Sequence, residues 1–131
     1  MISKQEYEEI GRKVVSAAFE VHKELGPGFL ESVYEICLFE ELKNLNLAVE
    51  RQVSLPVVYK GKTLSKNFCM DMLVENSVVI ELKTVSELLP LHEAQLLSYT
   101  KLAGLKLGFL INFDVPLIKY GIRRKVNNYY F

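Results

Sequence analysis

The spacing of apolar residues divides the chain into a helical first third and a remainder rich in strands. Apolar residues recur every three or four positions after Ser3, and Ser3 with Glu6 has the pattern of a capping box, which marks a helix start. Gly26-Pro27-Gly28 ends this helix, and a second helix is predicted from Leu30 to Leu45. The predicted buried residues are Ile10, Val14, Ala17, Ala18, Val21 and Leu25 in the first helix, and Leu30, Val33, Tyr34, Cys37, Leu38, Leu42 and Leu45 in the second.

After the second helix the apolar pattern changes to a period of two, which is typical of strands. Turns are predicted at Lys60-Gly61-Lys62 and Glu75-Asn76-Ser77, and a third helix is predicted over 91–103, between Pro90 and Gly104. The predicted strands are 49–53, 55–59, 64–74, 78–84, 107–113 and 118–126. The order ααββββαββ predicts one α/β domain over the whole chain, in which the two leading helices cover one face of a mixed sheet and the third helix covers the other.

Composition and charge narrow the functional classes. The 131 residues suit a single domain, and the balance of 16 basic and 16 acidic residues lacks the basic excess of a protein that coats nucleic acid non-specifically. Any contact with nucleic acid would therefore need a local patch. Because no apolar run reaches the roughly 20 residues of a membrane helix and the N-terminus has no signal-peptide core, we expect a soluble, cytoplasmic protein without a membrane partner. Cys37 and Cys69 form no CxxC pair and are predicted to be buried free thiols.

The segment with the clearest chemistry is the predicted hairpin of residues 68–83. A tight turn centred on Asn76 would pair Asp71 directly with Glu81, and strand alternation would place Lys83 on the face of Glu81. Two facing carboxylates repel each other, and a divalent cation would relieve that repulsion. Lys83 could then orient an attacking water, which suits metal-assisted hydrolysis of a phosphodiester. The alternative is a plain hairpin in which Lys83 forms a surface ion pair with either acid.

Polar residues of the second and third helices could join this site. Glu31 lies in the first turn of the second helix, at the edge of the buried stripe, where it could also be an ordinary helix-terminal acid. Tyr34 could pack against Glu31 or hydrogen-bond to it. The third helix presents polar residues on one face that could bind a phosphate or fix Lys83, or could simply lie in water. These residues are His92, Gln95 and Tyr99, of which His92 could also be a capping residue.

Several motifs, taken in order along the chain, resemble the small GxxExxY proteins, a family of the PD-(D/E)XK nuclease superfamily. The motif of the family name is Gly28-Phe29-Leu30-Glu31-Ser32-Val33-Tyr34. The similarity continues through Arg51-Gln52-Val53, Tyr59-Lys60-Gly61, Asp71-Met72-Leu73-Val74, Glu81-Leu82-Lys83, His92-Glu93-Ala94-Gln95-Leu96-Leu97-Ser98-Tyr99 and Gly108-Phe109-Leu110-Ile111-Asn112-Phe113. One departure is Met70, which stands before Asp71 where the superfamily name suggests proline.

The resemblance implies a restriction-endonuclease-like core and a nuclease that uses Mg²⁺ or Mn²⁺. It implies that Asp71, Glu81 and Glu31 are the metal ligands and that Lys83 is the lysine of the E-x-K element. Gln95 and Tyr99 resemble a Q-x-x-x-Y helix element, and with Tyr34 and His92 they are expected to support the site or bind substrate. The expected substrate is nucleic acid, with DNA favoured over RNA.

Two other functions compete with a nuclease. The first is a non-catalytic module that keeps the fold and binds nucleic acid or a protein partner, with which the neutral charge and small size are compatible. The second is a homo-oligomer held together by the aromatic tail Tyr129-Tyr130-Phe131.

Overall fold

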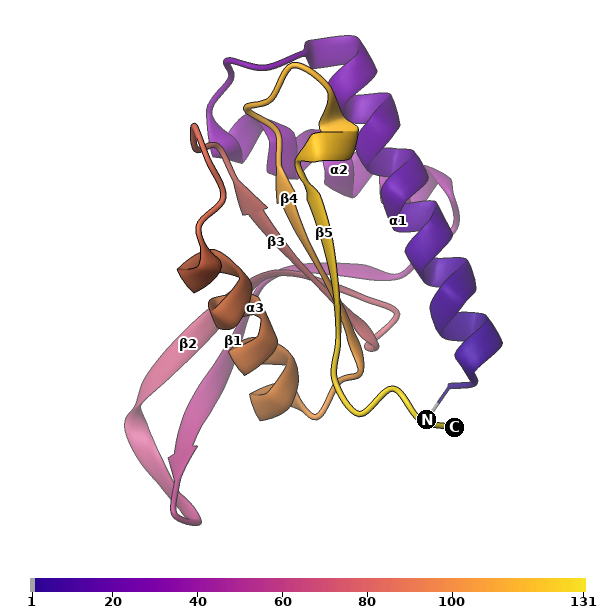
Figure 1. Cartoon of the computed structure of the whole chain (residues 1–131). Coiled ribbons are helices and arrows are strands. Elements are labelled where there is room, and N and C mark those ends of the chain that lie inside the picture. The colour runs from indigo at the N-terminus through magenta and orange to yellow at the C-terminus, as the bar shows by residue number, and fades with distance from the viewer. Residues whose placement is uncertain (1) are drawn as a thin grey trace.

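The computed structural model describes residues 2–131 as a five-stranded mixed sheet with three helices (Figure 1). The strands lie in the order β1-β2-β3-β4-β5, and β3 and β4 are parallel while the other neighbours are antiparallel. The elements are α1 (Lys4–Leu25), α2 (Glu31–Asn44), β1 (Val49–Tyr59), β2 (Lys62–Val74), β3 (Val78–Lys83), α3 (Pro90–Ala103), β4 (Leu107–Asn112), the 3₁₀ turn η1 (Ile118–Tyr120) and β5 (Ile122–Val126). The predicted fold class is confirmed.

The helices cover the two faces of the sheet as predicted. One apolar cluster joins α1 and α2 to alternate residues of β3 and β4, including Ile80 and Phe109. A smaller cluster joins Leu96 of α3 to Val79 and Leu110 on the opposite face. In β3 every residue but the last is buried, since helices lie on both faces. The sheet is thus shielded from water on both sides near the end of β3.

The local signals at the ends of the first helix are confirmed. The Ser3 hydroxyl accepts a hydrogen bond from the Glu6 N–H at 3.1 Å, and the Glu6 carboxylate accepts one from the Ser3 N–H at 3.2 Å, which is the predicted capping box. Gly26 ends α1 with a φ of 67°, and Gly28 has a φ of 106°, a backbone conformation that favours glycine. The chain therefore turns sharply between α1 and α2.

Three sequence predictions are wrong in detail. The predicted strands 49–53 and 55–59 form one continuous strand, β1, because Ser54 pairs with Cys69 in the ladder and Pro56 is accommodated at a bulge on this edge strand. Residues 118–120 form η1 and not the start of a strand. Leu30 is 74% exposed, because it is the N-cap of α2 and lies outside the buried stripe.

The cysteines also differ from expectation. Cys37 and Cys69 are free, as predicted, but Cys37 is half-buried and Cys69 is exposed. Cys69 lies in the part of β2 that pairs with β1 but not with β3, and its side chain is exposed there. Among the residues described, no helix is long and apolar enough to span a membrane.

Two peripheral features complete the architecture. β1 and β2 extend beyond the other strands as a two-stranded ribbon, at the lower left of Figure 1. The aromatic tail at the C-terminus packs on the start of α1. The Tyr129 hydroxyl hydrogen-bonds to Glu8 at 3.1 Å, and the Phe131 ring lies 5.7 Å from that of Tyr7. Two of the three tail aromatics thus dock on the chain itself, although Tyr130 remains 84% exposed.

Candidate functional site

The hairpin of β2 and β3 has the predicted register. Three residues, Glu75, Asn76 and Ser77, connect the strands, and the Ser77 N–H donates to Val74 O at 2.9 Å. Glu75 and Asn76 have φ values of 52° and 51°, as in tight hairpin turns. The ladder pairs Val74 with Val78, Leu73 with Val79 and Met72 with Ile80. The next residues in this register are Asp71 and Glu81, so the turn brings the two acids together.

The ladder ends one residue before the two acids, and their side chains take over the bonding. The Asp71 N–H donates to Glu81 Oε1 at 3.0 Å, and the Leu82 N–H donates to Asp71 Oδ2 at 2.8 Å. The predicted direct ladder pair between Asp71 and Glu81 is therefore wrong in this detail, because both main-chain donors bond a carboxylate and not a carbonyl. Each carboxylate is fixed by the opposite strand, which gives the pair a defined position at the point where the strands separate.

Burial makes this carboxylate pair electrostatically unusual. Glu81 is only 5% exposed. Burial, and then the charge on Asp71, raise the pKa of Glu81 to about 9, while the Lys83 ammonium acts in the opposite direction. The metal-free pair therefore retains a proton at neutral pH, and a cation between the carboxylates would displace that proton.

Lys83 lies on the same face of β3 as Glu81 and is half-buried. Within residues 2–131 it forms no ion pair with Asp71, Glu81 or any other acid. The plain hairpin with an ion-paired lysine is thus not found. The ammonium of Lys83 is available for a group that is not part of the folded chain.

Glu31 enters the site from the start of α2. Its side chain is exposed to solvent, yet the protein around it partly desolvates the carboxyl group. This desolvation and then the charge of Asp71 raise the pKa of Glu31, while Lys83 opposes the shift. These influences place Glu31 within electrostatic range of Asp71 and Lys83. The loop that leads into α2 lies at the end of the sheet where β3 ends in Figure 1.

A hydrogen bond between Tyr34 and Glu31 is one of the sequence predictions, and the structure does not contain it. Tyr34 instead fixes the loop that precedes α2. Its fully buried hydroxyl donates to Gly26 O at 2.6 Å and accepts from the Phe29 N–H at 3.2 Å. Its ring stacks on that of Phe113 with 4.5 Å between centroids. Tyr34 therefore positions the start of α2, and with it Glu31, from beneath.

The three residues of α3 have separate placements. Gln95 Nε2 donates to the Tyr99 hydroxyl at 3.0 Å, and the Tyr99 ring stacks on Phe68 of β2 at 5.0 Å. Burial raises the pKa of Tyr99, and the charge of Glu81 adds to this shift, so the two side chains lie near the carboxylates. His92 Nδ1 accepts a hydrogen bond from the Leu89 N–H at 2.9 Å, which is the capping role considered from the sequence.

Three residues near the site had no role in the sequence analysis. Gln52, which has a φ of 52°, donates to Glu35 Oε1 at 2.6 Å and accepts from the Cys69 thiol at 3.3 Å. Glu35 lies one helical turn after Glu31. Asn112 bonds both main-chain groups of Val85, at 2.8 and 3.0 Å, and so fixes the chain that leaves β3 after Lys83. Two features of the sequence could have indicated Gln52 and Glu35: the spacing of Glu31 and Glu35 by one helical turn, and the Arg51-Gln52-Val53 motif.

The donor set determines which cation could fit. Within the described residues no three His, Cys, Asp or Glu side chains converge closely enough to hold a metal ion by themselves. Asp71 and Glu81 form one unit, and Glu31 stands apart from it. Two carboxylates with water completing the shell are an ordinary set for Mg²⁺, whereas a structural zinc site needs four protein ligands, usually with sulfur or nitrogen donors. The residues therefore fit a hard divalent ion.

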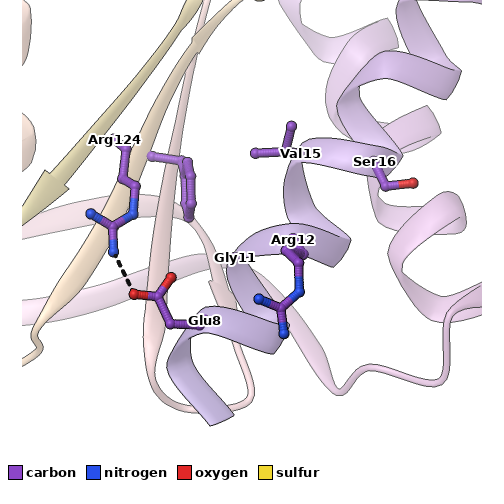
Figure 2. A pocket seen from close by; sticks show the side chains of 7 residues that line it. Glu8, Gly11, Arg12, Val15, Ser16 and Arg124 are labelled. Atoms are coloured by element: carbon purple, nitrogen blue, oxygen red, sulfur yellow. Dashed lines mark hydrogen bonds and ion pairs between the residues drawn. The ribbon is translucent and has the colours of Figure 1, made fainter. Parts of the chain in front are cut away.

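A separate pocket of about 390 Å³ lies between α1 and the edge of the sheet formed by β4 and β5 (Figure 2). Its floor includes Gly11 and Phe109, and its rim carries Arg124, whose guanidinium is 3.2 Å from Glu8. Phe109 belongs to the α1 face of the sheet, whereas Glu81 lies on the α3 face. The pocket is thus not part of the carboxylate site.

Comparisons with known proteins agree with this geometry. A family model described as the PD-(D/E)XK nuclease superfamily matches residues 8–125. A solved structure described as "Crystal structure of SSO0001" superimposes with a TM-score of 0.53 and 23% sequence identity, which shows a similar fold. The match covers 95% of this chain but 61% of that chain. No curated protein matches this chain.

Proposed function

Because this chain belongs to the PD-(D/E)XK nuclease superfamily, we propose that it is a metal-dependent nuclease that hydrolyses phosphodiester bonds of nucleic acid. The observation that carries this proposal is the unit formed by Asp71 and Glu81. Its carboxylates are anchored by main-chain N–H groups, one of them is buried, and an unpaired Lys83 lies beside them. In a purely structural hairpin, Lys83 would form an ion pair with one of the acids. Burial of Glu81 is costly, and its persistence favours a functional site over a decayed one.

The proposed metal is Mg²⁺ or Mn²⁺, which when bound would lower the pKa of the attacking water and offset charge on the phosphate. Asp71 and Glu81 would hold the ion, and Glu81 would release its proton as it does so. Glu31 would add a further carboxylate near the ion, directly or through water. Lys83 would orient the attacking water with its free ammonium.

The remaining residues would hold this arrangement in place. Gln95 and Tyr99 form a hydrogen-bonded pair beside the carboxylates, where their free donors could meet a substrate phosphate. Tyr34 would set the position of Glu31 through the loop, and His92 would fix the start of α3.

Four finer assignments belong to the same proposal. We place the chain in the GxxExxY branch, since Gly28, Glu31 and Tyr34 each have a physical role at the start of α2. DNA is the favoured substrate, and the free thiols of Cys37 and Cys69 fit a cytoplasmic location. A homo-oligomer or a protein partner would supply substrate-binding surface that a chain of 131 residues offers only sparingly.

The test is a cleavage assay on duplex DNA, single-stranded DNA and RNA with Mn²⁺, Mg²⁺ or chelator. Asp71→Asn is the most informative variant, because its amide oxygen can still accept from Leu82 while its charge is lost. We expect wild-type cleavage with either ion and none in chelator or in Asp71→Asn. Glu40→Gln, at an exposed position of α2, is the matched control. Binding to nucleic acid that is the same in chelator and in metal, without cleavage, would favour the non-catalytic module.

A further inference from the structure

The β1–β2 ribbon lies in one of two basic, acid-free stretches of a neutral protein. The other, residues 115–131, also has four basic residues, but Arg124 and Lys125 there form ion pairs with Glu8 and Glu93. Residues 51–70 contain four basic residues and no acid, whereas the other 111 residues contain 12 basic and 16 acidic residues. The basic residues of this segment are Arg51, Lys60, Lys62 and Lys66. Because the net charge is zero, any contact with nucleic acid needs a local basic patch, and this segment supplies one.

Lys60 and Lys62 flank Gly61 in the turn at the tip of the ribbon, and Lys66 lies in the part of β2 that pairs with β1 alone. This part of the ribbon projects from the body of the molecule in Figure 1. Lys60, Lys62 and Lys66 are all exposed, and none of them forms an ion pair with the described part of the chain. Tyr59 is 60% exposed beside them, with the Lys60 ammonium 5.5 Å from its ring centroid. The ribbon thus offers unneutralised cations and an aromatic face to solvent.

The ribbon is continuous with the carboxylate site. A single strand, β2, runs from Lys62 at the tip to Asp71 at the site. At about 3.3 Å per residue this separation is roughly 30 Å, which corresponds to about nine base pairs of duplex at 3.4 Å each. At its base, Phe68 stacks on Tyr99 of α3, so the direction of the ribbon is fixed relative to the site.

We propose that the ribbon of residues 54–68 is a clamp for duplex DNA. Lys60, Lys62 and Lys66 bind backbone phosphates up to about nine base pairs from the phosphodiester at Asp71. DNA is the proposed ligand because it is a polyanion, and the basic segment of the ribbon contains no acidic residue that would repel it. The inference rests on the proposed function for the place of the reacting bond, whereas the binding itself needs neither metal nor cleavage.

The test is fluorescence anisotropy of a labelled 30-base-pair duplex in chelator, at salt concentrations from 50 to 200 mM. The ribbon variant combines Lys60→Gln, Lys62→Gln and Lys66→Gln. A control variant removes the same charge from exposed positions of α1 and α2, at Lys4, Lys23 and Lys43. Three lost phosphate contacts should reduce the slope of log affinity against log salt by nearly three, so the loss of affinity over this range should shrink by about 40-fold. The control should keep the wild-type slope.

Two outcomes would overturn the clamp. One is an unchanged salt slope in the ribbon variant, and the other is an equal reduction in both variants, which would reflect total charge alone. Sedimentation of the same proteins tests whether the ribbon joins two copies of the chain instead. In that case the ribbon variant would have a lower mass in solution than the wild type, and its DNA affinity per protomer would be unchanged.

The outcomes also separate the clamp from the nuclease proposal. A protein that never cleaves but binds DNA through the ribbon would contradict only the nuclease. A protein that cleaves normally and binds independently of the ribbon would contradict only the clamp. Single-stranded DNA and RNA of the same length serve as further ligands, and tighter binding of either than of duplex DNA would contradict the choice of duplex.

Discussion

Replacing Glu81 by glutamine should stabilise the metal-free protein at neutral pH, although it removes a proposed metal ligand. The wild-type side chain is buried and its pKa is raised to about 9 by burial and by Asp71. An unfolded chain would ionise this group near its ordinary value of 4.5, so folding at pH 7 requires it to take up a proton. Glutamine is neutral in both states, and its amide can accept from the Asp71 N–H and donate to the Asp71 carboxylate as protonated Glu81 does.

The magnitude follows from the interval between the two pKa values. A raised pKa favours the folded state below pH 4.5, and this benefit is lost as the pH rises toward 9. Each unit above 4.5 costs the wild type about 1.4 kcal/mol relative to Glu81→Gln, which gives roughly 3 kcal/mol at pH 7. The gap should be small at pH 5 and should stop growing above pH 9.

The assay is urea unfolding in chelator at pH 5 to 9, followed by circular dichroism because the chain has no tryptophan. Glu40→Gln on the surface of α2 should track the wild type at every pH. With saturating Mn²⁺ the wild type should gain stability and Glu81→Gln should gain much less. If Glu81→Gln were less stable than the wild type at pH 7, or if the difference in stability were independent of pH, folding would not be coupled to proton uptake by Glu81.

Three further substitutions test the packing that supports the site. Tyr34→Phe should lose roughly 1 to 2 kcal/mol of unfolding free energy in a urea titration, since two hydrogen bonds to the loop before α2 disappear; no loss would mean that the hydroxyl does not hold the loop. Gly108→Ala should lower the melting temperature, with a cost of roughly 1 to 3 kcal/mol, because its Cβ would lie 2.9 Å from Leu96 Cδ1 and 3.1 Å from Thr100 Cγ2; an unchanged melting temperature would show that α3 can shift freely. Gly28→Ala meets no neighbour within 4 Å, so its expected cost of about 1 kcal/mol comes from the positive φ alone, and calorimetry that finds none would contradict that conformation.

Much of the fold could be predicted because it depends on residues close together in the sequence. The capping pair Ser3 and Glu6 and the hairpin turn at Glu75–Asn76 are local devices, and alternation within a strand then fixes which side chains share a face. Since the turn is short, it fixes the register as well, and the meeting of Asp71 and Glu81 follows from it.

The features that could not be predicted depend on contacts between distant segments. In the sequence, Ser54 separates two short apolar stretches, 49–53 and 55–59, and so predicts a break. Its pairing with Cys69, a distant residue, continues the strand through it. The bond from Gln52 to Glu35 spans 17 residues, and that from Asn112 to Val85 spans 27. The pKa of Glu81 depends on how completely the surrounding sheet and helices exclude water, which no spacing of residues reports.

The most direct test of the account is a calorimetric titration of Mn²⁺ into the wild type and into Asp71→Asn at pH 7. We expect the wild type to bind Mn²⁺ with release of protons, because the cation displaces the proton from Glu81. The measured heat should therefore depend on the ionisation enthalpy of the buffer. Asp71→Asn, folded as judged by circular dichroism, should bind weakly or not at all. Absence of binding by the wild type, or equal binding by the variant, would contradict a metal site at Asp71 and Glu81.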